Sequence, residues 1–316
     1  MSVFSTTNTK PLMPREIAAG MIKDTQAASV VSRLSGSEPM RFGTVDHLVF
    51  NDVPKAEFVE ENGEKSSSGG SFTSVTAVPH KAQVTMRFSE EVKWADEDYQ
   101  LGVFQTLAQA GSDALARALD LGVIHAINPL TGSKVAGWSN YIGASTNAVT
   151  ADAKTDADDQ FRNAVGMLIN QDKPVTVTGA ALDPAFSWEL SSLKVKDGSG
   201  ATSQPRYPQL GFGTDITSFM GLQTAQSNSV SGRPEAKDTL LRAIVGDWTN
   251  GLRWGVQRNI PVTLIDRGDP DGQGDLARKN QIALRLEIVY GWYVFTDRFA
   301  LVKAAAPKPP SGGEGR

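Results

Sequence analysis

The chain has 316 residues, of which 40% are hydrophobic and 21% are charged, and its formal net charge at pH 7 is −4. This length and apolar content allow a folded core, so wholesale disorder is excluded. The negative charge argues against a protein that wraps nucleic acid in a basic surface, and the absence of cysteine excludes disulfides, thiolate metal sites and cysteine nucleophiles.

The N-terminal residues contain no apolar segment of signal-peptide length, and no run of about 18 apolar residues occurs in the sequence. The most apolar stretch, 282–295, is interrupted by Arg285 and Glu287. We therefore expect a protein without a membrane span that assembles in a reducing cytoplasm.

Residues 1–43 predict an N-terminal arm. Pro14 suits the first position of a short helix, which would carry Ile17 and Met21 on one face. The segment is too small to fold alone, yet a free tail would not need its apolar residues, such as Val30. We therefore favour an arm that docks on a neighbouring subunit over a frayed terminus.

Residues 44–88 predict a long β-hairpin that projects from the subunit. In the return half, Val84, Met86 and Phe88 alternate with polar residues, as expected for a strand with one buried face. The tip, 62–70, is rich in glycine, serine and other turn-forming residues. A two-stranded ribbon of this length is only marginally stable alone in water, so we expect it to lie across a copy of the same chain.

Residues 96–127 predict the longest helix, because apolar and small residues recur along them at helical spacing. The acidic residues 96–98 suit the positive end of a helix dipole, and Asn128–Pro129 would end the helix. At 1.5 Å per residue it would be a rod on the order of 45 Å long. Its alanines and glycines would let neighbouring elements approach closely. A buried core helix is the simpler interpretation of the same pattern, and it holds whether or not the helix serves such close packing.

A loop rich in Gly, Ser, Asn and Thr at 130–155 is expected to precede a second unit. Helices are expected to begin at Asp156 and at Pro184, a residue suited to the first helical turn. The apolar runs predict strands at 174–181, 240–246, 260–266 and 281–302. The Pro- and Gly-rich tail after Lys303 is expected to be disordered.

Motifs for catalysis or cofactor binding are absent from the sequence. The only histidines, His47, His80 and His125, are not spaced as a metal-binding pair, and no nucleophile elbow or Walker loop occurs. We expect these histidines to be surface or half-buried polar residues. The segment 210–215 begins like a dinucleotide-binding turn, but Ile216 stands where a third glycine would be required.

Two acidic segments also fail as metal sites. The loop 269–275 resembles a calcium loop, but Pro270 interrupts it and Asn280 stands where a bidentate glutamate would be expected, so we interpret it as a solvated turn. The acids within 156–159 are interpreted as a helix start. Acids distant in the sequence could still pair for acid–base catalysis, but nothing nominates a pair. We therefore predict no catalytic, cofactor-binding or metal-binding residue, and favour a structural or binding protein over an enzyme.

Four segments, in a defined order and spacing, carry a resemblance to a known family: Ala56–Lys65, Val84–Trp94 with the helix 96–127 after it, Ala180–Leu222 and Ala243–Leu301. The first resembles an extended loop that reads as an apolar residue, valine, glutamate and then a glycine-containing acidic tip. The others resemble a return strand with a spine helix, an axial domain, and a late Gly-Asp-aromatic segment with a final strand. The chain thus resembles the major capsid proteins of tailed bacteriophages, which share their fold with encapsulin shells, over about residues 14–302.

The resemblance implies an α+β subunit with the tailed-phage major capsid fold. Its parts would be an N-terminal arm (1–43), an extended β-hairpin loop (44–88), a peripheral domain (89–150) with a spine helix (96–127), an axial domain (151–280), a closing strand of the peripheral domain (281–302) and a disordered tail (303–316). Arms and loops that reach over neighbours supply buried area without a larger core.

The resemblance also implies a structural subunit that self-assembles into hexamers and pentamers of an icosahedral virion shell, enclosing double-stranded DNA without sequence-specific binding. Head-to-tail contacts of one repeated chain can close such a lattice. A separate scaffolding protein is expected because only about 43 residues precede the hairpin; a portal and a decoration protein are further expected partners. Lys55 and Lys65 are candidate donors for a covalent link between subunits, but the sequence marks no acceptor.

The inter-subunit contact residues expected from this interpretation are Phe58, Glu60, Glu61 and Lys65, at the end of the hairpin. An encapsulin-like compartment that holds a cargo enzyme instead of a genome is the first alternative, and a soluble enzyme without a recognisable motif is the second. DNA or a cargo peptide in purified particles separates the two kinds of shell, whereas a small monodisperse monomer would favour the enzyme.

Overall fold

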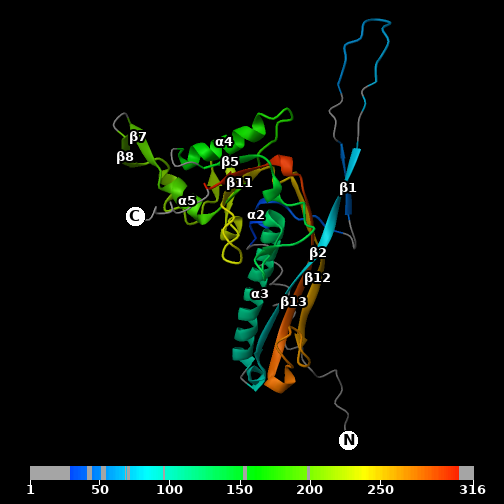
Figure 1. The fold of residues 1–316 in the computed structure, drawn as a ribbon, viewed down its shortest axis with the longest axis vertical. Coiled ribbons are helices and arrows are strands. Elements are labelled where there is room, and N and C mark those ends of the chain that lie inside the picture. Colours follow the sequence, from blue (N-terminus) through cyan, green and yellow to red (C-terminus); the bar gives the residue numbers. More distant parts are fainter. Residues whose placement is uncertain are drawn as a thin grey trace, which may run out of the picture.

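The computed structural model describes residues 29–40, 45–50, 55–67, 69, 72–94, 97–151, 155–197 and 200–305. It shows an elongated α+β molecule: a long helix and a four-stranded sheet form one part, and a six-stranded sheet with two shorter helices forms the other (Figure 1). Within these ranges, no helix is long and apolar enough to cross a bilayer.

The four-stranded sheet is antiparallel throughout, in the order β1 (Val45–Phe50), β2 (Phe72–Ser89), β13 (Gln281–Val294) and β12 (Leu252–Ile265). Along the central strand β13, every second residue is a buried apolar residue of the core: Leu284, Leu286, Ile288, Tyr290 and Trp292. This period of two is expected for a strand with one face packed against a helix.

The helix on that face is α3 (Glu97–His125), which confirms the long helix predicted at 96–127 but ends earlier. Ala126 leaves the helical conformation for the left-handed region, with φ 57°. The next two residues, Ile127–Asn128, form the short strand β3, which pairs with β4 (Ser133–Lys134). The helix therefore ends because the chain enters a hairpin there, before the Asn128–Pro129 pair is reached.

Small residues on α3 bring the sheet close, as expected. A Cβ added at Gly111 would lie 2.7 Å from Cδ1 of Leu286, and one added at Gly122 would lie 2.9 Å from Cη2 of Trp292. A side chain at either position would force its neighbour to move, so both glycines allow the observed close packing.

The six-stranded sheet is mixed. Its order is β5 (Ala148–Thr150), β14 (Phe299–Lys303), β11 (Leu241–Gly246), β6 (Gly179–Leu182), β10 (Leu222–Gln226) and β9 (Ser218–Phe219), with β5–β14 and β6–β10 parallel. The helices of this part are α4 (Ala157–Ile169) and α5 (Pro184–Ser191), and a separate hairpin is formed by β7 (Lys194–Asp197) and β8 (Gly200–Pro205). Short 3-10 helices complete the chain: η2 (Glu90–Trp94), η3 (Ile142–Ala144), η4 (Pro208–Leu210), η5 (Asn228–Val230), η6 (Ala277–Lys279) and η7 (Thr296–Arg298).

The two faces of the six-stranded sheet belong to different cores. On β11, Ile244 packs into the cluster that also contains α3 residues, whereas Ala243 and Val245 pack into the cluster formed with α4 and α5. Alternate residues of one strand thus bury opposite faces. The α4 helix contributes Ala157, Phe161, Ala164 and Leu168 at helical spacing.

The expected closing strand, 281–302, is wrong as a single element. It consists of β13 and β14, which lie in different sheets and are separated by the polar helix η7. Both strands are buried, so the apolar run does not reveal the break between them. The expected axial segment, 151–280, is likewise divided, because β12 within it belongs to the four-stranded sheet.

The described part of the expected arm, 29–40, packs on its own subunit. Val30 and Val31 are fully buried in the core that contains α3, within the short helix α2 (Val30–Leu34). For these residues, docking on a neighbouring subunit is therefore wrong, because the subunit's own α3 already covers them. Residues 1–28, including the helix expected at Pro14, lie outside the described residues, as does the tail beyond residue 305.

The expected ribbon, 44–88, is only partly a projecting ribbon. Residues 78–89 of β2 pair with β13 from Val78 opposite Trp292 to Ser89 opposite Gln281, so they form part of the subunit's own sheet. The reason is the buried face predicted from alternation, which packs against α3 and its core. The outer part, where β1 pairs with residues 72–77, projects away from the body (Figure 1).

Candidate assembly surface

The tip of the ribbon, residues 55–67, is closed by its own hydrogen bonds. The backbone N–H of Gly63 donates to the Glu60 carbonyl at 2.9 Å, and Asn62 adopts a left-handed conformation with φ 66° that suits this turn. Nearer the body, the Glu57 carboxylate accepts from the backbone N–H of Ser66 at 2.5 Å and from its Oγ at 2.6 Å. These bonds lower the pKa of Glu57, so the charged carboxylate holds the two sides of the tip together.

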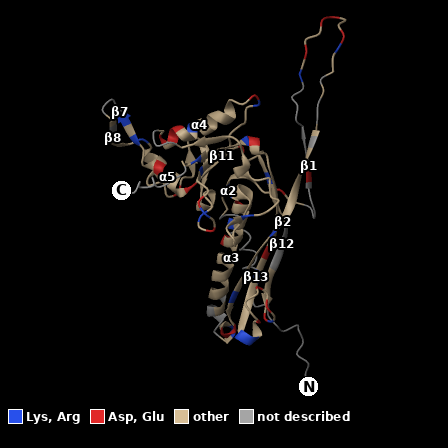
Figure 2. Ribbon diagram, in the orientation of Figure 1, with Lys and Arg blue, Asp and Glu red and all other residues tan. Residues whose placement is uncertain are grey.

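The structure places all four predicted contact residues on this one tip. Every residue from 55 to 67 is exposed, and the Phe58 side chain is as open to solvent as an isolated phenylalanine, at 109% relative exposure. The same tip carries the charged residues Glu60, Glu61 and Lys65, and Figure 2 shows acidic and basic residues along it. The tip is therefore a preformed turn that presents one aromatic ring together with charged residues.

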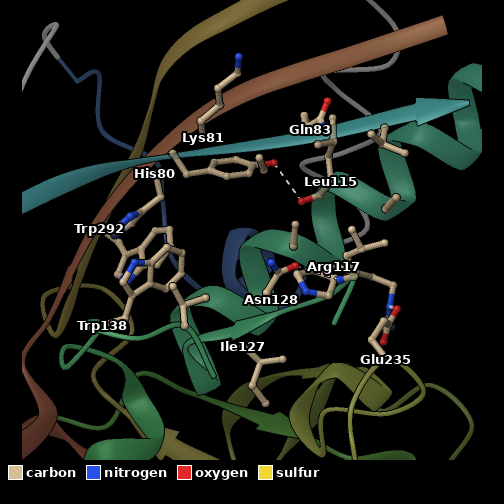
Figure 3. A pocket seen from close by; sticks show the side chains of 18 residues that line it. His80, Lys81, Gln83, Leu115, Arg117, Ile127, Asn128, Trp138, Glu235 and Trp292 are labelled. Carbon is tan, nitrogen blue, oxygen red and sulfur yellow. Dashed lines mark hydrogen bonds and ion pairs between the residues drawn. The ribbon is translucent and has the colours of Figure 1, made fainter. Parts of the chain in front are cut away.

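A groove of about 510 Å³ lies between β2, α3 and the loop that follows α3 (Figure 3). At one end, the His80 ring packs between Trp138 and Trp292, with ring centroids 3.9 and 4.3 Å away. Burial lowers the pKa of His80 to about 4, so the imidazole is neutral at pH 7. This histidine is half-buried, as expected.

The charged groups of the groove are already paired. Arg117 binds the Glu235 carboxylate at the opposite end from His80, and Lys81 Nζ lies 2.6 Å from Glu287 (Figure 3). Tyr290 donates its hydroxyl to the Leu115 carbonyl at 3.1 Å. The groove thus brings together aromatic faces and ion pairs, and its histidine and acid do not converge on one point.

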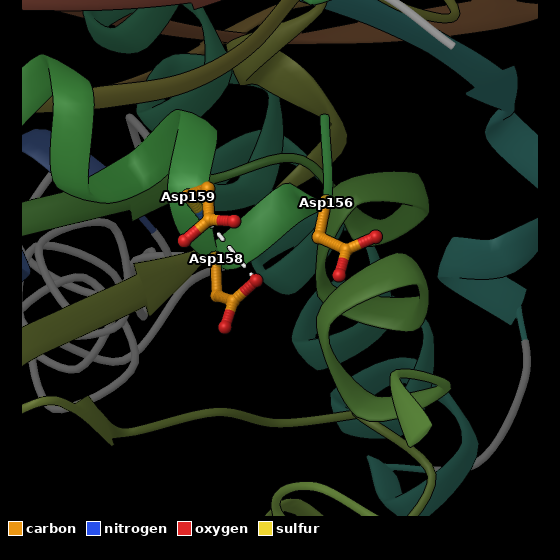
Figure 4. Close-up of side chains that lie close together, drawn as sticks. All are labelled: Asp156, Asp158 and Asp159. Atoms are coloured by element: carbon orange, nitrogen blue, oxygen red, sulfur yellow. Dashed lines mark hydrogen bonds between the residues drawn. The ribbon is translucent and has the colours of Figure 1, made fainter. Parts of the chain in front are cut away.

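Three acids, Asp156, Asp158 and Asp159, lie close together at the start of α4 (Figure 4), and cations bind the first two. Asp156 accepts from Lys196 Nζ at 2.8 and 2.7 Å, and Asp158 accepts from Arg206 at 2.9 and 2.8 Å and from the Tyr207 hydroxyl at 2.8 Å. These contacts lower the pKa of both carboxyls, against the desolvation of Asp158. Arg206 and Lys196 tie the β7–β8 hairpin and the residue after it to the predicted start of α4.

The loop 269–275 is largely exposed to solvent, as expected from the sequence, and it is also held by Arg87. The Arg87 guanidinium binds Asp271, lies 3.0 Å from the Asp269 carboxylate, and donates to the Gly274 carbonyl at 2.9 Å. Arg87 is on the neighbouring strand β2, more than 180 residues earlier in the chain. Sequence reasoning missed this clamp because nothing local to the loop indicates its partner.

Sequence reasoning also missed a buried acidic node on α3. Asp120 is 1% exposed and accepts four hydrogen bonds: from Ser29 Oγ at 2.6 Å, from the backbone N–H groups of Val30 and Val31 at 3.1 Å each, and from Ser229 Oγ at 2.8 Å. Desolvation raises its pKa although every donor favours the anion. The node joins the root of the arm, α3 and η5. An aspartate within an apolar helical stretch was the available signal.

His125 completes this region. Its ring is 5% exposed, and Nε2 lies 3.1 Å from the Ser229 carbonyl and 3.0 Å from the Val230 carbonyl, so Nε2 carries the proton. Burial lowers its pKa to about 4. It is a neutral structural donor, buried more deeply than the half-buried position expected for it. The side chain of His47 lies outside the described residues.

Comparison with known proteins gives one consistent result. The model of the phage capsid family matches residues 10–303. The probable major capsid protein gp17 of Mycobacterium phage D29 is 25% identical, with 97% of this chain and 93% of that protein covered. A solved structure from Mycobacterium phage Ogopogo is 46% identical, with a TM-score of 0.77 over 88% of this chain and 92% of that chain.

A second solved structure, from Gordonia phage Cozz, is 28% identical, with a TM-score of 0.75 over 88% of this chain and 87% of that chain. The tailed-phage major capsid fold expected from the sequence is therefore confirmed. The chain belongs to the phage capsid family: it is a structural subunit that assembles with itself into the capsid shell of a phage virion, and it is not an enzyme.

Proposed function

We propose that this capsid subunit forms hexamers and pentamers that close into an icosahedral shell around double-stranded DNA, without sequence-specific contacts to the DNA. The formal net charge of −4 supports a wall around DNA over a basic surface wrapped on it. The proposal includes assembly in the host cytoplasm on a separate scaffolding protein, with a portal and a decoration protein as further partners.

The observation that carries the proposal is the fully exposed ring of Phe58 on a preformed tip. Moving a phenylalanine side chain from water into a contact stabilises by about 1.5–3 kcal/mol. Glu60, Glu61 and Lys65 would form the polar rim of that contact. The tip would therefore be stabilised by contact with a partner.

The geometry of the ribbon favours an adjacent copy as that partner. Residues 78–89 of β2 are fixed in the subunit's own sheet, and the same strand continues outward to pair with β1. A continuous strand directs the tip away from the body (Figure 1). Each copy would thus extend its tip over the next, and a repeated head-to-tail contact of this kind generates closed rings.

The two sheets support a division into functional parts. We infer that the four-stranded sheet and α3 form the peripheral domain with its spine helix, that the six-stranded sheet with α4 and α5 forms the axial domain, and that the outer ribbon is the extended loop. In this division β13 and β12 belong to the peripheral domain and β14 to the axial domain.

The test is assembly of tip variants in cells that express the subunit with its scaffolding protein. Phe58→Ala and Glu60→Lys/Glu61→Lys are expected to reduce the yield of shells in sedimentation and electron microscopy, while thermal unfolding of the free subunit stays unchanged. Phe58→Leu, which keeps an apolar side chain, and Glu60→Gln/Glu61→Gln, which remove charge without reversing it, are the matched controls and should assemble better.

Normal shells from both Phe58→Ala and the double lysine variant would contradict the assignment of the tip as a contact. The composition of purified particles tests the remainder: double-stranded DNA supports the genome shell, whereas a cargo enzyme in particles without DNA would contradict it. Efficient assembly of the purified subunit alone would contradict the need for a separate scaffolding protein.

A further inference from the structure

A second groove, here called the tail groove, lies in the six-stranded part of the subunit. It has a volume of about 560 Å³ and is lined by residues from the start of α4, from α5 and from the segment that follows β14. Trp188 on α5 stands in its wall and is 57% exposed, although tryptophan is among the most apolar contact residues. Phe186 and Leu193 add apolar surface to the same groove.

The chain itself leaves the fold inside this groove. After β14, the backbone N–H of Ala304 donates to the Leu240 carbonyl at 2.7 Å, and both Ala304 and Ala305 line the groove. The residues that follow are Ala306-Pro307-Lys308-Pro309-Pro310, the start of the tail 306–316. A segment tethered at the edge of a site has an effective concentration on the order of millimolar, so even weak contacts can hold it.

The chemistry of this segment fits the groove. Closely spaced prolines favour the polyproline II helix, in which five residues span on the order of 15 Å. Such segments bind grooves lined by aromatic rings, because their conformation is already restricted before binding. The exposed face of Trp188 supplies the aromatic wall.

The tail groove also contains an acidic residue that suits the positive charge of Lys308. Glu189 follows Trp188 on α5 and lines the groove, and among the described residues no ion pair involves its carboxylate. Desolvation raises its pKa, opposed by the charge of Arg242, which is itself committed to Asp238 at 2.9 Å. Glu189 is therefore an acid without an ion-pair partner among the described residues. Lys308, between Pro307 and Pro309, would bring a cation to it.

We propose that residues 306–310 bind in the tail groove of their own chain as a polyproline II segment, with prolines against Trp188 and Lys308 beside Glu189. The C-terminal tail is then an ordered part of the subunit surface up to about Pro310, and the groove is its receptor. The inference concerns the single subunit and stands apart from the assembly contacts proposed above.

The absence of cysteine allows a direct test. A nitroxide label on a cysteine introduced as Ser311→Cys reports the motion of the tail in the otherwise complete chain. Its electron paramagnetic resonance spectrum is expected to show an immobilised component, which Trp188→Ala removes and Trp188→Phe largely keeps. Trp94→Ala is the control for loss of an exposed tryptophan, since Trp94 is 73% exposed and belongs to η2; it should leave the spectrum unchanged.

A charge exchange separates binding from a general loss of structure. Lys308→Glu should reduce the immobilised component, and adding Glu189→Lys to it should restore the component. Replacement of the three prolines 307, 309 and 310 by serine should abolish it. A label that is equally mobile in the parent and in Trp188→Ala, or a charge exchange without restoration, would overturn the proposal. Immobilisation that depends on mixing with unlabelled subunits would also overturn it, because the site would then be on another copy.

Discussion

The hydroxyl of Ser29 donates a 2.6 Å hydrogen bond to the carboxylate of Asp120, 91 positions later in the chain. Through this contact and the two backbone N–H groups that follow Ser29, the long helix α3 holds the point at which the N-terminal segment enters the fold. The same carboxylate receives Ser229 from η5. One buried acid therefore joins three segments that are distant in sequence.

Asp120→Ala is expected to destabilise the free subunit by about 2–4 kcal/mol, because it leaves several buried donors without an acceptor. Asp120→Asn keeps one carbonyl oxygen and should lose less. Urea unfolding of the unassembled subunit measures both, and hydrogen exchange should show faster exchange at Val30 and Val31. Asp113→Asn, an exposed acid on the same helix, is the control and should change stability by less than about 0.5 kcal/mol. An alanine variant as stable as the parent would show that the carboxylate does not hold the arm root.

Two glycines of α3 should respond oppositely to the same substitution. Gly122→Ala places a Cβ 2.9 Å from the Trp292 ring, and we expect a net loss of about 1–2 kcal/mol, since overpacking exceeds the gain in helix propensity. Gly102→Ala meets no atom within 4 Å and should stabilise by about 0.5–1 kcal/mol. Thermal unfolding of the two single variants checks the sign of each. Equal effects would mean that the helix can shift away from the sheet.

The two described histidines predict how stability depends on pH. Burial lowers the pKa of His80 and of His125 from 6.5 to about 4 in the folded subunit. The unfolded chain therefore binds more protons between these values, so stability is complete above pH 6.5 and falls as pH decreases toward 4. Denaturant midpoints measured at pH 7 and pH 4.5 should differ in this direction.

Variants in which His80 or His125 is replaced by a residue that does not titrate test whether these histidines cause the pH dependence. His125→Gln keeps a donor for the carbonyls of Ser229 and Val230, and His80→Phe keeps a ring between Trp138 and Trp292. Each should reduce the difference in midpoint between the two pH values, and the pair together should reduce it further. An unchanged difference in the double variant would assign the pH dependence to other groups.

Local patterns in the sequence were sufficient for several elements. Apolar and small residues at helical spacing predicted α3 almost to its ends, because a helix that covers a sheet must carry such a stripe. Alternation at Val84, Met86 and Phe88 predicted the buried face of β2. Asp156 and Pro184 predicted the starts of α4 and α5, because acidic residues and proline are common at the first positions of helices. The Asp183 side chain caps α5, whereas the Asp156 side chain makes no cap hydrogen bond.

The family and the exposed tip were also accessible from the sequence. The order of the four quoted segments identified a phage capsid protein, and the glycine-rich, charged stretch around Phe58 predicted a projecting turn. Both signals are local or ordered along the chain, and neither depends on which segments meet in space.

The remaining features depend on contacts between segments that the sequence does not connect. The run 281–302 is apolar on both sides of the short polar segment 296–298, and the packing of β13 against α3 and of β14 beside α4 decides that it is two strands in two sheets. Asp120 receives its donors from residues about 90 and 109 positions away, and Arg87 clamps a loop more than 180 positions later. The sequence by itself determined the elements, the family and the exposed tip, because those follow from periodicity and composition. The pairing of buried charges and the division of strands between sheets were decided only by tertiary structure, because each requires a partner that the fold brings from elsewhere.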